Sequence, residues 1–238
     1  MAKLLPTKRG KKRVTAPTDM HAGIDYGLAG LGEIIRAFRL RVPKYQRDYA
    51  WDAQNILDLL DDLAGAIEKG EARHFLGSVV MTRVGPEELE IVDGQQRLAT
   101  AFMILCAIRD YFTEQKDPSR AEAVSNKYIS TSDLKSKCVV PRIVLNATDD
   151  TFFQDHVVDR GPGKGETIKP SKSSHHRIAD AFLRISDRVK KIAEVAGSAG
   201  DEALIKWVEF IDRGAAAIRV IVPDHATAFT IFETLNDR

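Results

Sequence analysis

A short polar stretch at residues 93–97 separates two apolar segments, and it constrains the local fold more than any other feature of the chain. Ile91 and Val92 end a brief apolar run just before it, and from Leu98 onward apolar residues recur at helical spacing. The residues that mark this spacing are Leu98, Phe102, Leu105, Ile108 and Phe112. The pattern predicts a buried strand that passes directly into a helix, with the polar residues at the turn between them.

The five residues of this turn are Asp93, Gly94, Gln95, Gln96 and Arg97, and their chemistry suits an anion. A helix N-terminus exposes backbone N–H groups, and its dipole favours negative charge. Gly94 has no Cβ and lets a ligand or another backbone approach closely. The two glutamine amides can donate and accept hydrogen bonds, Arg97 can grip a phosphate with two donors, and Asp93 can hold a metal or a hydroxyl. The structural alternative is a solvated turn in which Asp93 caps the helix. The residues alone leave both interpretations open.

Three further segments carry distinctive residues. Residues 42–51 read Val-Pro-Lys-Tyr-Gln-Arg-Asp-Tyr-Ala-Trp, residues 74–80 read His-Phe-Leu-Gly-Ser-Val-Val, and residues 231–238 read Ile-Phe-Glu-Thr-Leu-Asn-Asp-Arg. With Asp-Gly-Gln-Gln-Arg at 93–97, these blocks resemble in order the N-terminal domain of GmrSD-type, modification-dependent restriction proteins. The same domain occurs in the SspE protein, which acts on phosphorothioated DNA. The likeness runs from about Leu31 to the last residue.

The resemblance implies an α+β fold, with a ParB/sulfiredoxin-like small-sheet core and an appended helical subdomain. It also implies a sensor domain of a phage-defence restriction system. Such a domain binds and hydrolyses an NTP (GTP or ATP, with Mg²⁺), recognises modified double-stranded DNA and controls a nuclease. The chain stops at Arg238, before the HNH-type nuclease region that usually follows in the family. Nuclease activity is therefore expected from a C-terminal region or a separate partner, not from this chain.

The motif residues are carried over from the resemblance by position, and their individual roles are inferred from their chemistry. Asp93 would hold Mg²⁺ or orient water, and Asn236 and Arg238 would close the pocket from the far end of the chain. The catalytic set is Asp93, Gln95, Gln96 and Arg97, and the nucleotide-binding set is Gly94, Gln95, Arg97, Asn236 and Arg238. Tyr45, Gln46 and Arg47 would form the opposing wall and contact DNA or nucleotide, because Arg and Tyr together suit a base and its phosphate.

Two other functional readings compete with the sensor. A ParB-like DNA-binding module would use nucleotide only as a ligand, without turnover. A DNA-cutting enzyme is disfavoured, because His156 and His225 resemble a nuclease motif only superficially and lack a second histidine and an asparagine at suitable spacing.

Charge is unevenly distributed along the 238 residues. The net charge is +1, from 35 basic and 34 acidic residues, and residues 1–18 hold six of the basic residues and no acid. We therefore expect a basic disordered arm at 1–20, which either contacts nucleic acid or only aids solubility.

A nucleotide-binding core is expected at 21–112. A mostly helical portion at 113–238 would return to the core through 216–238. No apolar run approaches the ~18 residues that span a membrane, and no secretion signal is visible, so we expect a cytoplasmic protein. The oligomeric state is open.

Periodicity and turn residues predict the remaining elements. Strands are expected at 75–82 and 89–92 around a turn at 84–88, and a helix from about 95 to 111. Asp52 is expected to cap a helix at 56–67, and residues 139–145 to form an edge or extended segment. An apolar strand is expected at 216–222 and a helix at 227–235. We also expect Cys106 and Cys138 to be buried thiols, and His175 and His176 to lie at the surface.

Overall fold

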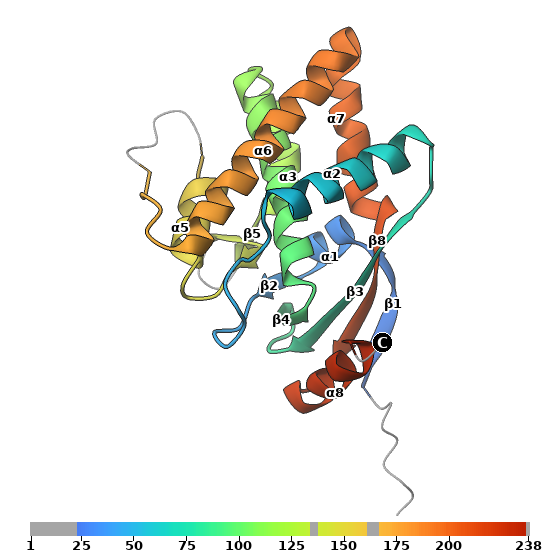
Figure 1. The fold of residues 1–238 in the computed structure, drawn as a ribbon, viewed down its shortest axis with the longest axis vertical. Coiled ribbons are helices and arrows are strands. Elements are labelled where there is room, and N and C mark those ends of the chain that lie inside the picture. The colour runs from blue at the N-terminus through green and yellow to red at the C-terminus, as the bar shows by residue number, and fades with distance from the viewer. Residues whose placement is uncertain (1–22, 134–137, 161–166, 237–238) are drawn as a thin grey trace, which may run out of the picture.

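The computed structural model describes residues 23–133, 138–160 and 167–236, and these residues form a mixed six-stranded sheet beneath a thick helical layer (Figure 1). A separate two-stranded sheet joins β5 to β6. The predicted α+β class is confirmed. The predicted arm at 1–20 and Arg238 lie outside the described residues. The strands are β1 (Asp25–Gly30), β2 (Arg39–Arg41), β3 (His74–Arg83), β4 (Glu88–Asp93), β5 (Ser130–Asp133), β6 (Cys138–Pro141), β7 (Ile143–Val144) and β8 (Ala215–Val222).

The six strands follow the order β1-β8-β3-β4-β2-β7. β3 and β4 form the predicted antiparallel hairpin, with Arg83 opposite Leu89. β8 lies between β1 and β3, antiparallel to the first and parallel to the second. The predicted segment at 139–145 divides, because β6 pairs with β5 while β7 forms the edge of the main sheet beside β2. The sheet therefore takes strands from both of the predicted portions of the chain.

Eight α-helices accompany the strands in the described residues. They are α1 (Leu31–Ala37), α2 (Ala53–Glu68), α3 (Gln95–Glu114), α4 (Pro118–Val124), α5 (Asp150–Phe153), α6 (Ser173–Ala196), α7 (Gly200–Glu209) and α8 (His225–Asn236). Three π-helical turns, η1 (Ser125–Ile129), η2 (Gln154–Val158) and η4 (Phe210–Gly214), extend α4, α5 and α7, and a 3₁₀ turn, η3 (Gly197–Ala199), joins α6 to α7. Asp52 caps α2 as predicted, in a reciprocal capping box with Asn55.

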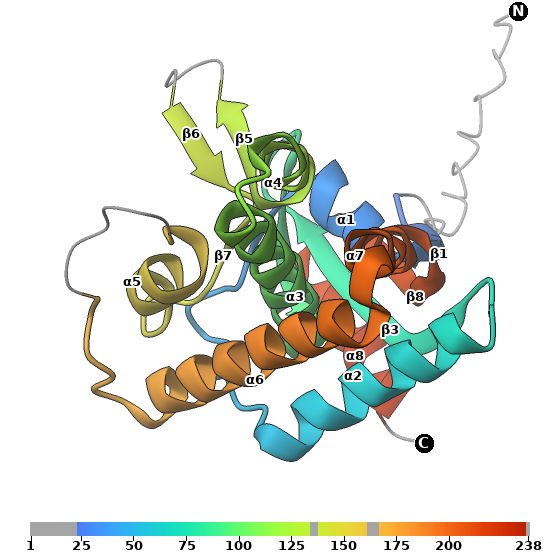
Figure 2. The same cartoon turned by 90° about the horizontal axis from the view of Figure 1, so that it is seen from above.

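Helix α3 is the centre of the core. It packs against α1, α4, α6 and α7, and Figure 2 shows it running between α4 and α6. All five apolar residues that predicted it are at most 1% exposed. Because α3 is buried along almost its whole length, its first turn is held rigidly at the end of β4. The polar turn thus sits on a fixed support.

Helix α8 covers the opposite face of the sheet, away from the other helices (Figure 1). A second, small apolar cluster joins it to the strands, and the buried members of this cluster are Val80, Val220, Val222 and Ala228. The main core and this cluster are separated by the sheet itself. Helix α8 therefore has a much smaller apolar anchorage than α3.

Two predictions about single residues are wrong. His175 is buried rather than exposed, because its ring stacks on Phe152 at a centroid distance of 4.4 Å and its Nε2 lies 3.0 Å from the Thr148 carbonyl oxygen. Cys138 is exposed at the start of β6 in the small two-stranded sheet, whereas Cys106 is buried as predicted.

Candidate functional site

The turn between β4 and α3 depends on Gly94. This residue has a left-handed backbone with φ of +87° and forms the N-cap of α3. A Cβ at this position would lie 2.9 Å from Val79 Cγ2 and 3.1 Å from the Ser78 carbonyl oxygen. The interpretation of Asp93 as the N-cap is wrong, because Asp93 is the last residue of β4 and no side chain caps the helix. Within the described part of the chain, no side chain accepts a hydrogen bond from the first N–H groups of α3.

Arg97 is anchored on the neighbouring strand. Its guanidinium donates a hydrogen bond to the Leu76 carbonyl oxygen and lies 3.8 Å from the Asp93 carboxylate. Gly77 makes room for it, since a Cβ there would lie 2.6 Å from Arg97 Nη1. The blocks at 74–80 and 93–97 are therefore in direct contact. Only about a quarter of the Arg97 side chain is exposed, at 24%.

Gln96 holds a loop instead of facing solvent. It is buried, and its Oε1 accepts hydrogen bonds from the backbone N–H groups of Ala50 at 3.0 Å and Trp51 at 3.4 Å. Its Nε2 donates to the Asp48 carbonyl oxygen at 3.5 Å. These contacts fasten the block at 42–51 to the first turn of α3. In this structure Gln96 acts as a positioning residue.

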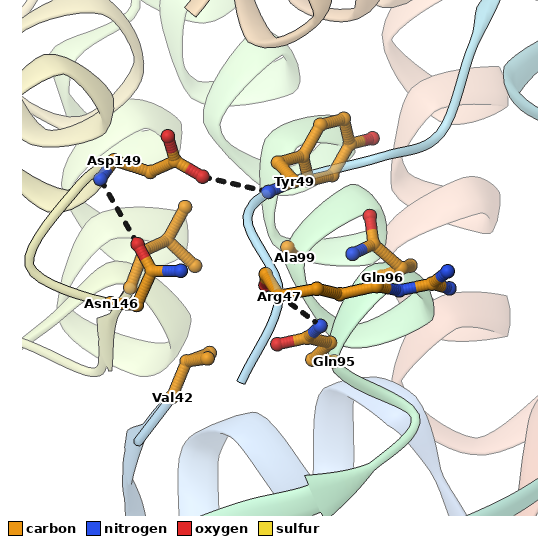
Figure 3. A pocket seen from close by; sticks show the side chains of 9 residues that line it. Val42, Arg47, Tyr49, Gln95, Gln96, Ala99, Asn146 and Asp149 are labelled. Carbon is orange, nitrogen blue, oxygen red and sulfur yellow. Dashed lines mark hydrogen bonds between the residues drawn. The ribbon is translucent and has the colours of Figure 1, made fainter. Parts of the chain in front are cut away.

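The neighbouring polar residues complete the attachment of this loop. Gln95 Nε2 donates to the Arg47 carbonyl oxygen at 3.2 Å, and Gln46 Nε2 donates to the Val92 carbonyl oxygen at 2.8 Å. The Arg47 side chain is exposed and extends between Gln95 and Gln96 (Figure 3). Its guanidinium has no hydrogen bond or ion pair with any residue that the structure describes. The result is an unpaired cation beside the uncapped start of α3.

A small pocket lies beneath the Arg47 side chain, with a free volume of about 10 Å³. That volume admits roughly one water molecule. Its lining residues are Val42, Arg47, Tyr49, Gln95, Gln96, Ala99, Leu145, Asn146 and Asp149 (Figure 3). The structure thus brings together Arg47, Gln95 and Gln96 from the predicted set.

Two residues of this pocket were not predicted from the sequence. Asn146 Nδ2 donates to the Gln46 carbonyl oxygen at 3.2 Å and to Asp48 Oδ1 at 3.0 Å. Asp149 is buried, and its carboxylate accepts a hydrogen bond from the Tyr49 N–H at 2.7 Å. The polar residues at 146–150, directly after the predicted extended segment at 139–145, could have indicated a turn with polar side chains there, because asparagine and aspartate favour turns.

Tyr49 is a core residue of this loop. It is 4% exposed, its hydroxyl lies 2.8 Å from Thr100 Oγ1, and burial raises the pKa of that hydroxyl. It therefore stays neutral and cannot act as a base near neutral pH.

Tyr45 turns away from the pocket towards the other face of the sheet. It is 65% exposed, and its hydroxyl lies 3.0 Å from Nδ1 of His225 at the start of α8. Asn236 is the last residue of α8, about 16 Å from His225 along the axis at 1.5 Å per residue. Its predicted role at the pocket stays a prediction, as does that of Arg238, which is outside the described residues.

The charges at the turn favour an anion. The first turn of α3 contains no acidic residue and includes Arg97, so its positive dipole end is reinforced. Asp93 is the carboxylate of the turn, 27% exposed. Among the residues that the structure describes, no three His, Cys, Asp or Glu side chains gather as a metal site.

Comparison with known proteins identifies a family. The family model described as the N-terminal domain of the GmrSD restriction endonuclease matches residues 31–238. No curated protein matches the chain. Within the described residues, none of the helices combines the length and apolarity needed to cross a membrane.

Proposed function

The chain belongs to the family of GmrSD restriction endonuclease N-terminal domains, and we propose that it binds and hydrolyses a nucleoside triphosphate in response to modified DNA. Family membership makes it a component of a restriction system. The turn at 93–97 would bind the phosphates. Hydrolysis would then control a nuclease supplied by a C-terminal region or a separate chain.

The observation that carries this proposal is the unpaired guanidinium of Arg47 beside the uncapped N-terminus of α3. A cation next to the positive end of a helix dipole is unfavourable by itself. A phosphate would offset that repulsion and would also accept hydrogen bonds from the free N–H groups of the first turn. The same turn bears Gly94, which keeps side-chain atoms away from the backbone there.

Because the pocket is small, the triphosphate would lie on the outer surface of the turn. A free volume of about 10 Å³ cannot contain a phosphate chain, so the phosphates would lie between Arg47 and the backbone of residues 94–97. Gln95 and Gln46 tie the loop to the turn and so fix the distance between these two walls. Phosphoryl transfer needs mainly such positioning and charge stabilisation.

Asp93 is the residue of this turn that suits Mg²⁺. Mg²⁺ commonly binds one or two carboxylates together with substrate phosphates, and a single, partly exposed carboxylate beside a phosphate site meets that need. When bound, the ion would neutralise phosphate charge. Asp93 would also hold Arg97 in place, since the two side chains are 3.8 Å apart.

The test is phosphate release from GTP and from ATP with Mg²⁺, on the full chain. DNA duplexes of one sequence would be added unmodified, with a base-linked sugar, with a methyl group or with a backbone sulfur. The informative variant is Arg47→Ala, because its guanidinium holds no other part of the structure, whereas Arg97→Ala would also remove the bond to Leu76. Arg73→Ala, an exposed arginine between α2 and β3, is the matched control.

We expect hydrolysis that one modified duplex stimulates. Arg47→Ala should lower kcat/KM by roughly 10- to 100-fold, the loss of one charged hydrogen-bonding partner. Arg73→Ala should behave as wild type. Absence of hydrolysis in every condition, with nucleotide-dependent DNA binding intact, would replace the proposal with a DNA-binding module that uses nucleotide only as ligand.

A further inference from the structure

Three residues from three separate elements form a hydrogen-bonded chain on the α8 side of the sheet. Tyr45 follows β2, Glu90 lies on β4 three residues before Asp93, and His225 is the first residue of α8. The Tyr45 hydroxyl lies 3.0 Å from His225 Nδ1, and His225 Nε2 lies 3.1 Å from Glu90 Oε2. No part of the proposed phosphate site uses Glu90 or His225.

The two contacts fix the tautomer of a neutral imidazole. A carboxylate only accepts, so the ring nitrogen that faces Glu90 must carry the proton. That leaves Nδ1 as the acceptor, and the Tyr45 hydroxyl donates to it. Glu90 thus orients His225, and His225 orients Tyr45. His225 is itself half exposed, so the chain of contacts orients a side chain at the protein surface.

The position of the Tyr45 ring is unusual for a residue held in this way. The side chain is 65% exposed, and its ring meets the imidazole edge to face, with centroids 6.0 Å apart and planes at 83°. One end is therefore fixed while much of the ring surface stays open. Lys44 and Arg47, both exposed, flank it in the loop, and Gln46 ties the same loop to β4. An exposed aromatic ring is a usual platform on which a base stacks.

We infer that His225, supported by Glu90, is the positioning residue that holds Tyr45 as a stacking platform for a nucleobase. The inference deepens the proposed function and rests on it for the origin of the base. Fixing the ring before binding lowers the conformational entropy that binding must remove. The base could belong to the free nucleotide or to DNA, and the experiment separates the two.

The first arm of the test needs no ligand. In the full chain labelled with ¹⁵N-histidine, the neutral His225 ring should show the Nε2–H tautomer. The Nδ1 resonance should shift in Tyr45→Phe, which removes only the hydroxyl. Tyr26→Phe is the matched control, because Tyr26 is an exposed tyrosine on β1 at the other edge of the sheet. An unchanged His225 spectrum in Tyr45→Phe would overturn the positioning contact, whatever the protein binds.

The second arm measures binding of GTP, of ATP and of the DNA duplexes. Tyr45→Phe and His225→Ala should each weaken binding about five-fold, the effect of one neutral hydrogen bond. The double variant should be no weaker than either single one, because both changes break the same chain. Glu90→Gln keeps an acceptor for Nε2 and should stay near wild type, as should His176→Ala, an exposed histidine on α6. Tyr45→Leu should weaken binding more than Tyr45→Phe does, because it removes the aromatic ring.

The possible outcomes distinguish failure of the Tyr45 platform from failure of the proposed function. Losses seen only with free nucleotide, or only with DNA, identify the source of the base and support the platform. If wild type binds these probes and the variants bind equally well, the platform is overturned while the proposed function stands. If wild type binds none of them, the proposed function fails and the platform fails with it.

Discussion

Gly94 permits a stability test of the turn that needs no ligand. Gly94 and Gly70 both have positive φ, +87° and +66°. A Cβ at Gly70 would meet nothing within 4 Å, whereas one at Gly94 would press on Val79 and Ser78. Gly70→Ala should therefore cost only the backbone strain, about 1–2 kcal/mol. Gly94→Ala should cost that strain plus overpacking, about 3 kcal/mol or more. Urea unfolding of both variants measures the two losses of stability. Equal losses would show that β3 shifts to accommodate the new Cβ at no energetic cost.

Replacing Gln95 should mainly affect phosphate release, whereas replacing Gln96 should mainly affect stability. Gln96 is buried and accepts hydrogen bonds from two partly buried backbone N–H groups, so Gln96→Ala should destabilise the protein by about 2 kcal/mol because both donors lose their acceptor. Gln95 is only partly buried and makes one bond to the Arg47 carbonyl oxygen. Gln95→Ala should change stability by less than ~0.5 kcal/mol and lower phosphate release. Thermal unfolding measures the change in stability, and the phosphate assay measures the change in activity. If Gln96→Ala instead lowered phosphate release without loss of stability, Gln96 would regain its predicted catalytic role.

Helix α8 should be the least stable of the long helices. In the described residues its apolar anchorage is the small cluster around Val220 and Ala228, whereas α3 is buried along its length. Segments with few buried contacts open locally at lower free energy than the global unfolding. Native-state hydrogen exchange should therefore show α8 amides exchanging well before those of α3, with α2 between them. Equal protection in α3 and α8 would contradict this and would imply that the sheet and α8 unfold together.

The elements that could be predicted are those whose signal is local. The β3–β4 hairpin and α3 follow from alternation, a turn and helical spacing within some forty residues. The place of β8 between β1 and β3 could not be predicted, because these pairings join segments about 190 and 140 residues apart along the chain. β1 itself was missed, since Asp25–Gly30 contains two glycines and little alternation.

The candidate site divides in the same way. The turn at 93–97 could be located from the sequence, and so could the loop that carries Arg47. The partners of these residues could not, because Gln96 looks like any exposed polar residue until the backbone of Ala50 and Trp51 is placed against it. His225 was judged only as a nuclease residue, and its contact with Tyr45 spans 180 positions. The family resemblance supplied residue types, and the fold supplied what each of them touches.

The uneven charge of the chain leads to a test that involves the protein as a whole. Residues 1–18 hold six basic residues, and the remainder carries 29 basic and 34 acidic residues, a net charge of −5. A body with that charge repels DNA at long range, so DNA affinity should depend strongly on these six cations. Each phosphate contact contributes about 0.9 to the slope of log K against log salt, so six contacts would contribute about 5.

Replacing the six basic residues with glutamine keeps the length of the segment and removes only its charge. If the segment contacts DNA, the magnitude of the salt slope should fall by up to about 5 in this variant and equally in a chain lacking residues 1–18. Phosphate release without DNA should stay at the wild-type level, because the turn at 93–97 is untouched. An unchanged slope would show that the segment does not contact DNA, and the exposed cations Lys44 and Arg47 would then be the next residues to replace.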